Sequence, residues 1–187
     1  IYFKKDISVL KSPLNYAGSK DKMFTVIQRY FPKHIETFVD VMGGAFNMGV
    51  NVYATDKIIY NDVNPYVEKI VRWLLTEEKL KIVDSVQKTI EMFGMEKANS
   101  ESYNKLKEYY NANKSVLALF VLHMYSFQNY IRFNKAQQFN TPIGVAGYSS
   151  DLKNRILKFV SRCPHLSFLN ENFMNIDWDK FDENTLF

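Results

Sequence analysis

Two short segments hold the residue types from which a nucleotide-binding site could be built. Ile35 to Met42 is a β-branched and aromatic run that ends at Gly43-Gly44, as a buried strand followed by a tight turn would. Glycine lets a ligand approach the backbone because it has no Cβ. Asp62 follows a second apolar run, 19 residues beyond Gly43, and an acidic residue at about that offset can accept hydrogen bonds from ribose hydroxyls. The alternatives are an ordinary strand-to-helix turn and a helix cap at Asp62.

A third segment, Tyr16-Ala17-Gly18-Ser19-Lys20, places a small turn before a lysine at the start of a predicted helix. Such a turn can present backbone N–H groups and one ammonium group to a carboxylate. The alternative is a plain helix N-cap at Ser19, which the segment by itself favours.

A fourth segment, residues 127–144, interleaves Arg, Asn and Gln with aromatic residues. Side chains such as Arg132 and Asn134 can read base edges, and aromatic rings such as that of Tyr130 can stack on bases. Composition alone favours the alternative, a surface loop with an aromatic mini-core of its own. In either case Pro142 and the loss of helical period predict an exposed loop or hairpin.

The elements that must position these segments alternate between helices and strands. Apolar spacing predicts a helix over 20–30, ended by Pro32. Strands are expected over 35–42, 57–61 and 166–169, with a fourth beginning at 186. A short helix is expected over 45–50, and Pro65 fits the first turn of another. This order predicts an α/β fold with a parallel sheet.

Residues 77–149 differ in character from the rest of the chain. Residues 77–113 are charged and helical with no predicted strand, and 115–128 form a strongly apolar helix. A helix returns over 151–163. We therefore expect the sheet to be interrupted by a mainly helical insert.

Composition excludes several classes of protein. The 187 residues are 47% hydrophobic, which argues against intrinsic disorder because disorder needs low hydrophobicity. The longest apolar run, 116–124, is too short to cross a bilayer. Cys163 is the one cysteine and cannot form an internal disulfide, which suits a reducing cytoplasm. It and the three histidines lack metal-ligand spacing, so no metal is expected. A net charge of +4 permits a polyanionic partner without requiring one.

Taken together and in this order, the segments resemble the Dam-type DNA adenine-N6 methyltransferases. The resemblance runs from about residue 12 to 187, and its motifs are Tyr16-Ala17-Gly18-Ser19-Lys20, the loop 38–46, Asn61-Asp62-Val63-Asn64, Arg132-Phe133-Asn134 with 139–144, and Asn170-Glu171-Asn172-Phe173. No single motif is specific for the family, but the order of the motifs and the intervals between them are.

The resemblance implies a Rossmann-like class I methyltransferase sheet, with the first strand central and the fourth beside it, and S-adenosylmethionine as cofactor. Residues 1–76 would be the cofactor-binding part, 77–149 the helical and hairpin target-recognition insert, and 150–187 the return to the methyltransferase domain. The implied cofactor contacts are Tyr16 and Lys20 near the methionine end, Phe38, Gly43 and Gly44 in the loop, Asp62 on the ribose, and Asn172 and Phe173 flanking the adenine.

The implied partner is double-stranded DNA. Arg132 would reach a guanine edge in the major groove, because arginine is the usual bidentate partner of guanine. Tyr130 and Pro142 would make apolar base contacts beside it, and Asn134 belongs to the same motif. Many relatives read GATC, which makes GATC the first sequence to consider. A restriction-modification partner and a solitary methylase are both compatible with this resemblance.

The chain departs from the family pattern at several positions. Asp40 stands where relatives usually carry proline, Val39 where they often carry glutamate, and Ala45 replaces a third glycine. Ser19 replaces a glycine of the first motif. In the recognition loop, Gln128-Asn129 replaces an Asn-Gly pair, which affects the expected DNA sequence.

The family's catalytic motif, Asp or Asn followed by Pro-Pro and an aromatic residue, is absent, because no two prolines are adjacent. Asn64-Pro65-Tyr66 lacks the second proline and follows the second strand. We therefore expect the 187 residues to be part of a longer protein, with no catalytic residue among them and no turnover by themselves. The alternatives are a catalytically inactive DNA-binding or regulatory fragment, and a methyltransferase acting on RNA or a small molecule, against which the hairpin speaks.

Overall fold

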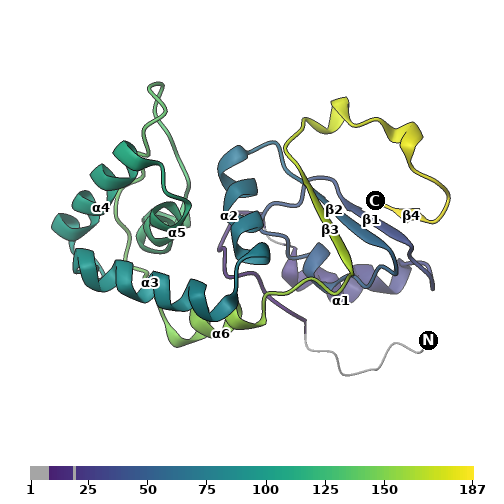
Figure 1. Ribbon diagram of the computed structural model, residues 1–187, viewed down its shortest axis with the longest axis horizontal. Coiled ribbons are helices and arrows are strands. Elements are labelled where there is room, and N and C mark those ends of the chain that lie inside the picture. Colours follow the sequence, from purple (N-terminus) through teal and green to yellow (C-terminus); the bar gives the residue numbers. More distant parts are fainter. Residues whose placement is uncertain (1–8, 19) are drawn as a thin grey trace.

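A parallel four-stranded sheet forms one half of the molecule in the computed structural model, which describes residues 9–18 and 20–187. The strands are β1 (Thr37–Asp40), β2 (Lys57–Asn61), β3 (His165–Leu169) and β4 (Thr185–Leu186), in the order β3-β2-β1-β4 (Figure 1). The predicted α/β fold with a parallel sheet is confirmed, and β4 lies beside β1 as expected. Ser19, the alternative N-cap, lies outside the described residues.

The strand register brings the carboxyl ends of the strands to one edge of the sheet. Asp40 of β1 is the partner of Tyr60, and Asn61 at the end of β2 is the partner of Leu169 at the end of β3. On the other side of β1, Phe38 is the partner of Leu186. The segments that follow β1, β2 and β3 therefore leave the sheet side by side.

The helix α2 (Pro65–Thr76) joins this sheet to the rest of the molecule. Asn64 is its N-cap, with the side-chain oxygen accepting from the N–H groups of Tyr66 and Val67, and Pro65 is its first residue, where a missing N–H costs nothing. Its buried apolar side chains recur at helical spacing, at positions 67, 70, 71 and 74. Figure 1 shows α2 between the sheet and the helical half.

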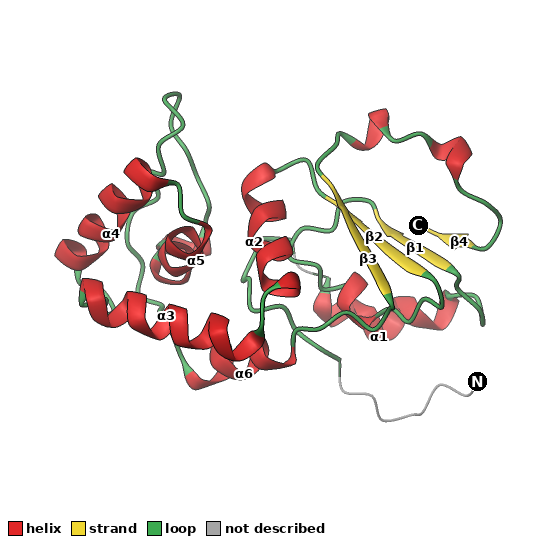
Figure 2. Ribbon diagram, viewed as in Figure 1, coloured by secondary structure: helices red, strands yellow, loops and turns green. Residues whose placement is uncertain are grey.

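The helical half contains α3 (Lys79–Phe93), α4 (Ser100–Asn113) and α5 (Val116–Tyr125), with α6 (Ser150–Lys158) lying along α3 (Figure 2). The apolar α5 is almost wholly buried at its centre. It includes His123, whose ring nitrogens have no hydrogen-bond partner among the described residues. Burial lowers the pKa of His123 to about 3, because the charged imidazolium would lose its hydration. This helix is a core element and His123 is a neutral core residue.

Three predicted helices differ from the structure. The helix over 20–30 is divided into a 3₁₀ turn at Asp21–Met23, α1 (Phe24–Ile27) and a second 3₁₀ turn at Gln28–Tyr30. The helix over 115–128 ends at Tyr125, because Ser126 is extended, with φ of -75° and ψ of 154°. Gln128 and Asn129 then adopt left-handed backbone angles, with φ of 50° and 55°. The helix over 151–163 ends at Lys158.

The prediction of a helix over 45–50 is wrong. Phe46 has a φ of 63°, which a continuous right-handed helix cannot contain. Its ring is fully buried and makes edge contacts with Tyr60 and Phe159, at centroid distances of 5.5 and 6.3 Å. A single 3₁₀ turn follows at Gly49–Asn51. Burial of the Phe46 ring therefore outweighs local helix propensity in this segment.

Candidate ligand site and recognition hairpin

The carboxylate of Asp62 lies at the centre of the edge where the strands end. Its Oδ2 accepts the backbone N–H of Gly44 at 2.9 Å, and its Oδ1 accepts that of Asn64 at 2.8 Å. A carboxylate offers about four lone-pair sites, so capacity remains for further donors. Asp62 is 9% exposed. Since Asn64 is the cap of α2, the simple reading of Asp62 as the helix cap does not hold.

The glycine pair after β1 is explained in part by packing. A Cβ on Gly43 would lie 2.5 Å from Cε2 of Tyr60, far inside contact distance. The Tyr60 hydroxyl donates to the carbonyl of Gly44 at 2.8 Å, and burial raises the pKa of this phenol. Gly44 has a φ of 49°, a left-handed angle that favours glycine. Gly43 is thus needed by the tyrosine beneath it, and Gly44 by the turn itself.

Asn61 ties together the segments that follow β1 and β3. Its side-chain amide donates to the carbonyls of Val41 at 2.8 Å and Glu171 at 3.0 Å, and its oxygen accepts the N–H of Glu171 at 2.9 Å. Nearby, the Asn170 amide donates to the carbonyl of Asp62 at 2.6 Å. Both asparagines lie in motifs noted in the sequence, but only the structure shows that they join the segments after β1, β2 and β3.

Asp40 adds a second carboxylate below the loop. It is buried and accepts the N–H of Gly49 at 3.1 Å. Burial raises the pKa of Asp40 to about 6, and the charge of nearby Asp62 adds to this, while the Gly49 hydrogen bond opposes it. Asp40 and Asp62 thus place two acidic side chains near one another at this edge of the sheet, an arrangement that favours a positively charged ligand group.

The predicted residues of the first motif differ in their surroundings. The ring of Tyr16 lies 3.5 Å from where a Cβ of Gly44 would be, and its hydroxyl accepts from the Asn64 amide at 3.4 Å. Tyr16 is therefore joined to the edge that holds Asp62. Lys20 is exposed, and its ammonium donates to the carbonyl of Gly18 at 3.0 Å.

The other predicted cofactor residues lie on both sides of this edge. Phe38 is within β1, where its side chain is 4% exposed and belongs to the hydrophobic core. Asn172 follows β3, and its side chain accepts the N–H of Met174 at 3.0 Å. The adjoining Phe173 is 49% exposed, so its ring surface is open to a planar ligand. Gly43, Gly44 and Asp62 lie at the edge itself, Phe173 follows the Glu171 segment that Asn61 joins to it, and Phe38 supports the edge from within β1.

The predicted recognition segment forms a hairpin that holds Arg132 in place. Phe133 and Phe139 form an antiparallel bridge. The Nε of Arg132 donates to the side-chain oxygen of Asn140 at 2.9 Å, and Nη2 donates to its carbonyl at 3.1 Å. Arginine has five N–H donors, so these bonds leave donors on both terminal nitrogens. The exposed guanidinium is thus oriented with a free fork.

The remaining predicted base-contact residues lie on the same hairpin as this arginine. Tyr130 is 47% exposed, and its carbonyl accepts from the hydroxyl of Thr141 at 3.1 Å. Asn134 and Gln138 bind one another across the hairpin turn. Pro142 is exposed, and its carbonyl accepts the N–H of Phe127 at 2.8 Å. Arg132 and Tyr130 therefore lie on one ordered surface, supported by Asn140 and Thr141, which sequence reasoning did not single out.

Two further observations concern what the described residues lack. No group of three His, Cys, Asp or Glu side chains in residues 9–18 and 20–187 could hold a metal ion. Within the same part of the chain, no helix is long and apolar enough to span a membrane.

Comparison with known proteins agrees with this arrangement. Residues 16–186 match the family model of the D12 class N6 adenine-specific DNA methyltransferases. Over its whole length the chain is 39% identical to the modification methylase LlaI of Lactococcus lactis subsp. lactis, and over 97% of its length it is 35% identical to the type II methyltransferase M.FokI of Planomicrobium okeanokoites. A DNA adenine methylase of Salmonella typhi is 29% identical over 70% of the chain. The chain spans 30%, 29% and 46% of the lengths of these relatives. The chain therefore belongs to the D12 class of N6 adenine-specific DNA methyltransferases.

Proposed function

We propose that the protein containing this chain transfers a methyl group from S-adenosylmethionine to N6 of adenine in duplex DNA. The observation that carries the proposal is the contact between Asp62 and Gly44. It places a carboxylate with unused acceptor capacity beside a glycine turn, at the carboxyl ends of adjacent parallel strands. That is where open α/β sheets bind nucleotide-like ligands.

The residues at this edge fit such a cofactor. S-adenosylmethionine supplies an electrophilic methyl group on a positively charged sulfonium. Asp62 would accept hydrogen bonds from the ribose hydroxyls, and the exposed ring of Phe173, with Asn172, would flank the adenine. Tyr16 and Lys20 would bind the methionine end, where a carboxylate needs donors or a cation. Phe38 would support the Gly43-Gly44 turn from the core.

The hairpin would read the DNA. Arg132, with its free fork, suits a guanine edge, and Tyr130, Asn134 and Pro142 would contact bases or backbone beside it. GATC is the first sequence to test. Since LlaI is a modification methylase by name and M.FokI a type II methyltransferase, a role beside a restriction enzyme is the proposed context.

Transfer itself would need the Pro-Pro motif. The five prolines of the 187 residues are all separated from one another, so we propose that these residues bind cofactor and DNA without catalysing transfer alone. The alternative, a binding or regulatory protein of the same family, predicts the same binding and no transfer in any context.

The test is methyl transfer by the complete protein that contains this chain. Duplex DNA is incubated with isotope-labelled S-adenosylmethionine, and its digested nucleosides are analysed by mass spectrometry. We expect labelled N6-methyladenine, lost in Asp62→Ala and retained in Asp84→Ala, which removes an exposed carboxylate paired with Lys88 on α3. DNA binding without transfer in the wild type would instead support the regulatory alternative.

A further inference from the structure

Tyr66, in the first turn of α2, contacts the recognition hairpin directly. Its ring stacks on that of Phe133 with a centroid distance of 3.7 Å and an interplanar angle of 16°. Its hydroxyl donates to Oε1 of Gln137 at 2.7 Å. The two contacts hold the hairpin turn from its side and its end, so they restrain its orientation as well as its distance from α2.

Tyr66 is also fixed to the edge that holds Asp62. Its backbone N–H donates to the side-chain oxygen of Asn64 at 3.0 Å, and the N–H of Asn64 donates to Oδ1 of Asp62. The other oxygen of Asp62 holds Gly44. Hydrogen bonds therefore connect Gly44 in the candidate cofactor turn, through Asp62 and Asn64, to Tyr66, which contacts the hairpin.

On the hairpin side, Phe133 is the immediate neighbour of Arg132. The stacked ring thus lies one residue from the guanidinium that Asn140 orients. Because successive side chains of an extended strand point to opposite faces, holding the ring of Phe133 against α2 keeps Arg132 on the face away from it. The position of Tyr66 thereby sets the direction in which Arg132 is presented.

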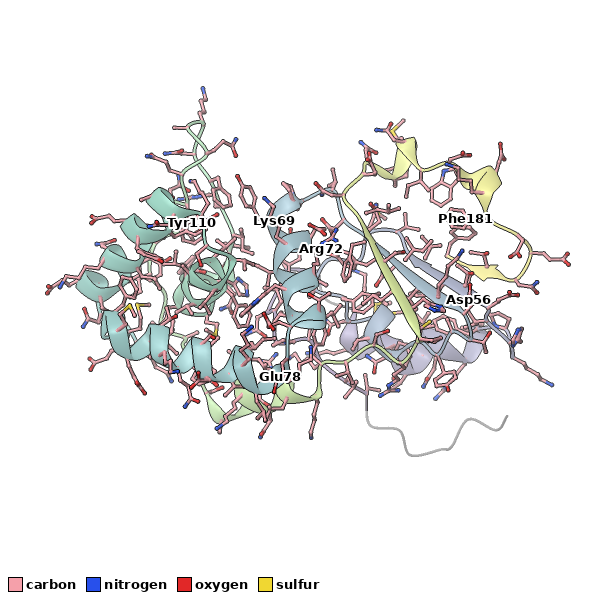
Figure 3. The ribbon with its side chains drawn as sticks, in the orientation of Figure 1. Asp56, Lys69, Arg72, Glu78, Tyr110 and Phe181 are labelled. Atoms are coloured by element: carbon pink, nitrogen blue, oxygen red, sulfur yellow. The ribbon has the colours of Figure 1, made fainter. Side chains whose placement is uncertain are left out.

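The insert holds the hairpin by separate contacts. Asn111 on α4 binds both backbone groups of Phe139, at 3.2 and 2.7 Å, and Lys114 donates to the carbonyl of Gln137 at 2.8 Å. Tyr110, labelled in Figure 3 opposite Lys69 of α2, makes an edge contact with Phe139 at 6.0 Å. The hairpin is therefore also held by contacts that do not involve Tyr66, and Tyr66 adds the link to the cofactor half.

We infer that Tyr66 is a positioning residue for DNA sequence discrimination. It fixes the Arg132 hairpin relative to the cofactor edge, so that the contacted base and the target base keep a set spacing. The inference rests on the proposed function. Tyr66 itself contacts neither DNA nor cofactor in this inference. It affects discrimination between DNA sequences and leaves the general affinity for DNA unchanged.

The experiment measures both quantities in the complete protein with S-adenosylhomocysteine bound, so that no transfer occurs. The wild type first selects its preferred duplex from a pool with a short randomised segment. The dissociation constants for that duplex and for the same duplex with one base pair changed are then compared among wild type, Tyr66→Leu, Tyr66→Phe and Phe133→Leu. Tyr53→Leu is the matched control, because Tyr53 is 63% exposed in the sheet half.

Tyr66→Leu removes both contacts, so we expect the ratio of the two constants to fall about fivefold. Affinity for an unselected duplex, cofactor affinity without DNA and the melting temperature should stay close to wild type. Tyr66→Phe keeps the stacked ring and loses the hydrogen bond to Gln137, so the ratio should fall about twofold. This variant tests the inference even if Tyr66→Leu does not fold. Because both changes remove the same stack, the ratio in the double variant should fall by less than the product of the two single losses.

An unchanged ratio in Tyr66→Leu, or a uniform loss of affinity for all duplexes, would overturn the inference. Tighter binding in Tyr66→Leu would also overturn it, since the stack would then oppose DNA binding. A wild type that selects no sequence from the pool would overturn the proposed function instead, which separates the two failures.

Discussion

The Asp62 carboxylate accepts the backbone N–H of Gly44 at 2.9 Å, across the ends of two neighbouring parallel strands. This bond joins the acidic residue after β2 to the glycine turn after β1. It explains how two short segments, 18 residues apart, form one candidate site. Asn61 joins the segment after β3 to the same edge through its hydrogen bonds with Glu171.

The two glycines of the turn should tolerate substitution differently. In Gly43→Ala the new Cβ would meet the Tyr60 ring at 2.5 Å, and overpacking of a buried site costs about 1–3 kcal/mol. In Gly44→Ala the Cβ meets only Tyr16 at ordinary contact distance, and the cost is the left-handed backbone, about 1 kcal/mol. Urea unfolding at pH 7 should show the larger loss in Gly43→Ala. Equal losses would contradict the packing explanation.

Arg132→Ala should weaken DNA binding in a sequence-dependent way. If the free fork reads one guanine, the substitution costs about 1–3 kcal/mol for the preferred duplex and relaxes selection at one base position. Binding to duplexes changed at each position in turn, followed by fluorescence anisotropy, measures this. A uniform loss over all sequences, with a smaller salt dependence, would instead identify Arg132 as a phosphate contact.

The side chain that orients this arginine offers a second readout. Asn140→Ala removes the oxygen that accepts from Nε and leaves the guanidinium charge in place. We expect the same base position to be relaxed as in Arg132→Ala, with nearly unchanged affinity for unselected DNA. Retention of full selectivity in Asn140→Ala would show that the hydrogen bond does not orient the fork.

Asp40 should make the folded state less stable as the pH rises. Its pKa is about 6 in the folded chain, above the ordinary value of 3.8, so the folded state binds the proton more strongly. Stability from this group is complete below pH 3.8 and is lost as the pH rises through 6. Asp40→Asn keeps an acceptor for Gly49 and removes the buried charge. The free energy of unfolding of Asp40→Asn, relative to that of the wild type, should therefore be about 2 kcal/mol higher at pH 8 than at pH 4.

Urea unfolding of wild type and Asp40→Asn at the two pH values checks this prediction. The difference between the proteins is the relevant quantity, because groups away from Asp40, such as His123, titrate equally in both. If the difference in unfolding free energy between the two proteins does not change with pH, burial does not raise the pKa of Asp40.

Much of the sheet could be predicted from local sequence. The run at 57–61 is a strand with the expected bounds, and Pro65 begins α2 with Asn64 as its cap. Alternating helix and strand signals implied parallel pairing, and the structure shows it for all four strands. These features depend on residue type and near neighbours, which a single sequence displays.

Features that depend on distant contacts could not be predicted. The segment 45–50 is irregular because the Phe46 ring packs on Tyr60 and Phe159, and periodicity carries no sign of that. The bonds of Asn61 with Glu171 cross 110 residues of sequence. The same holds for the stack of Tyr66 on Phe133, which joins the two halves.

The central claim is that Asp62 binds S-adenosylmethionine, and calorimetric titration of the complete protein with this cofactor tests it most directly. Loss of hydrogen bonds to a charged acceptor costs about 1.5–3 kcal/mol. We therefore predict that the wild type binds and that Asp62→Ala weakens binding roughly 10- to 100-fold, while Asp84→Ala binds like wild type. Equal binding by wild type and Asp62→Ala, or no binding by a folded wild type, would contradict the account.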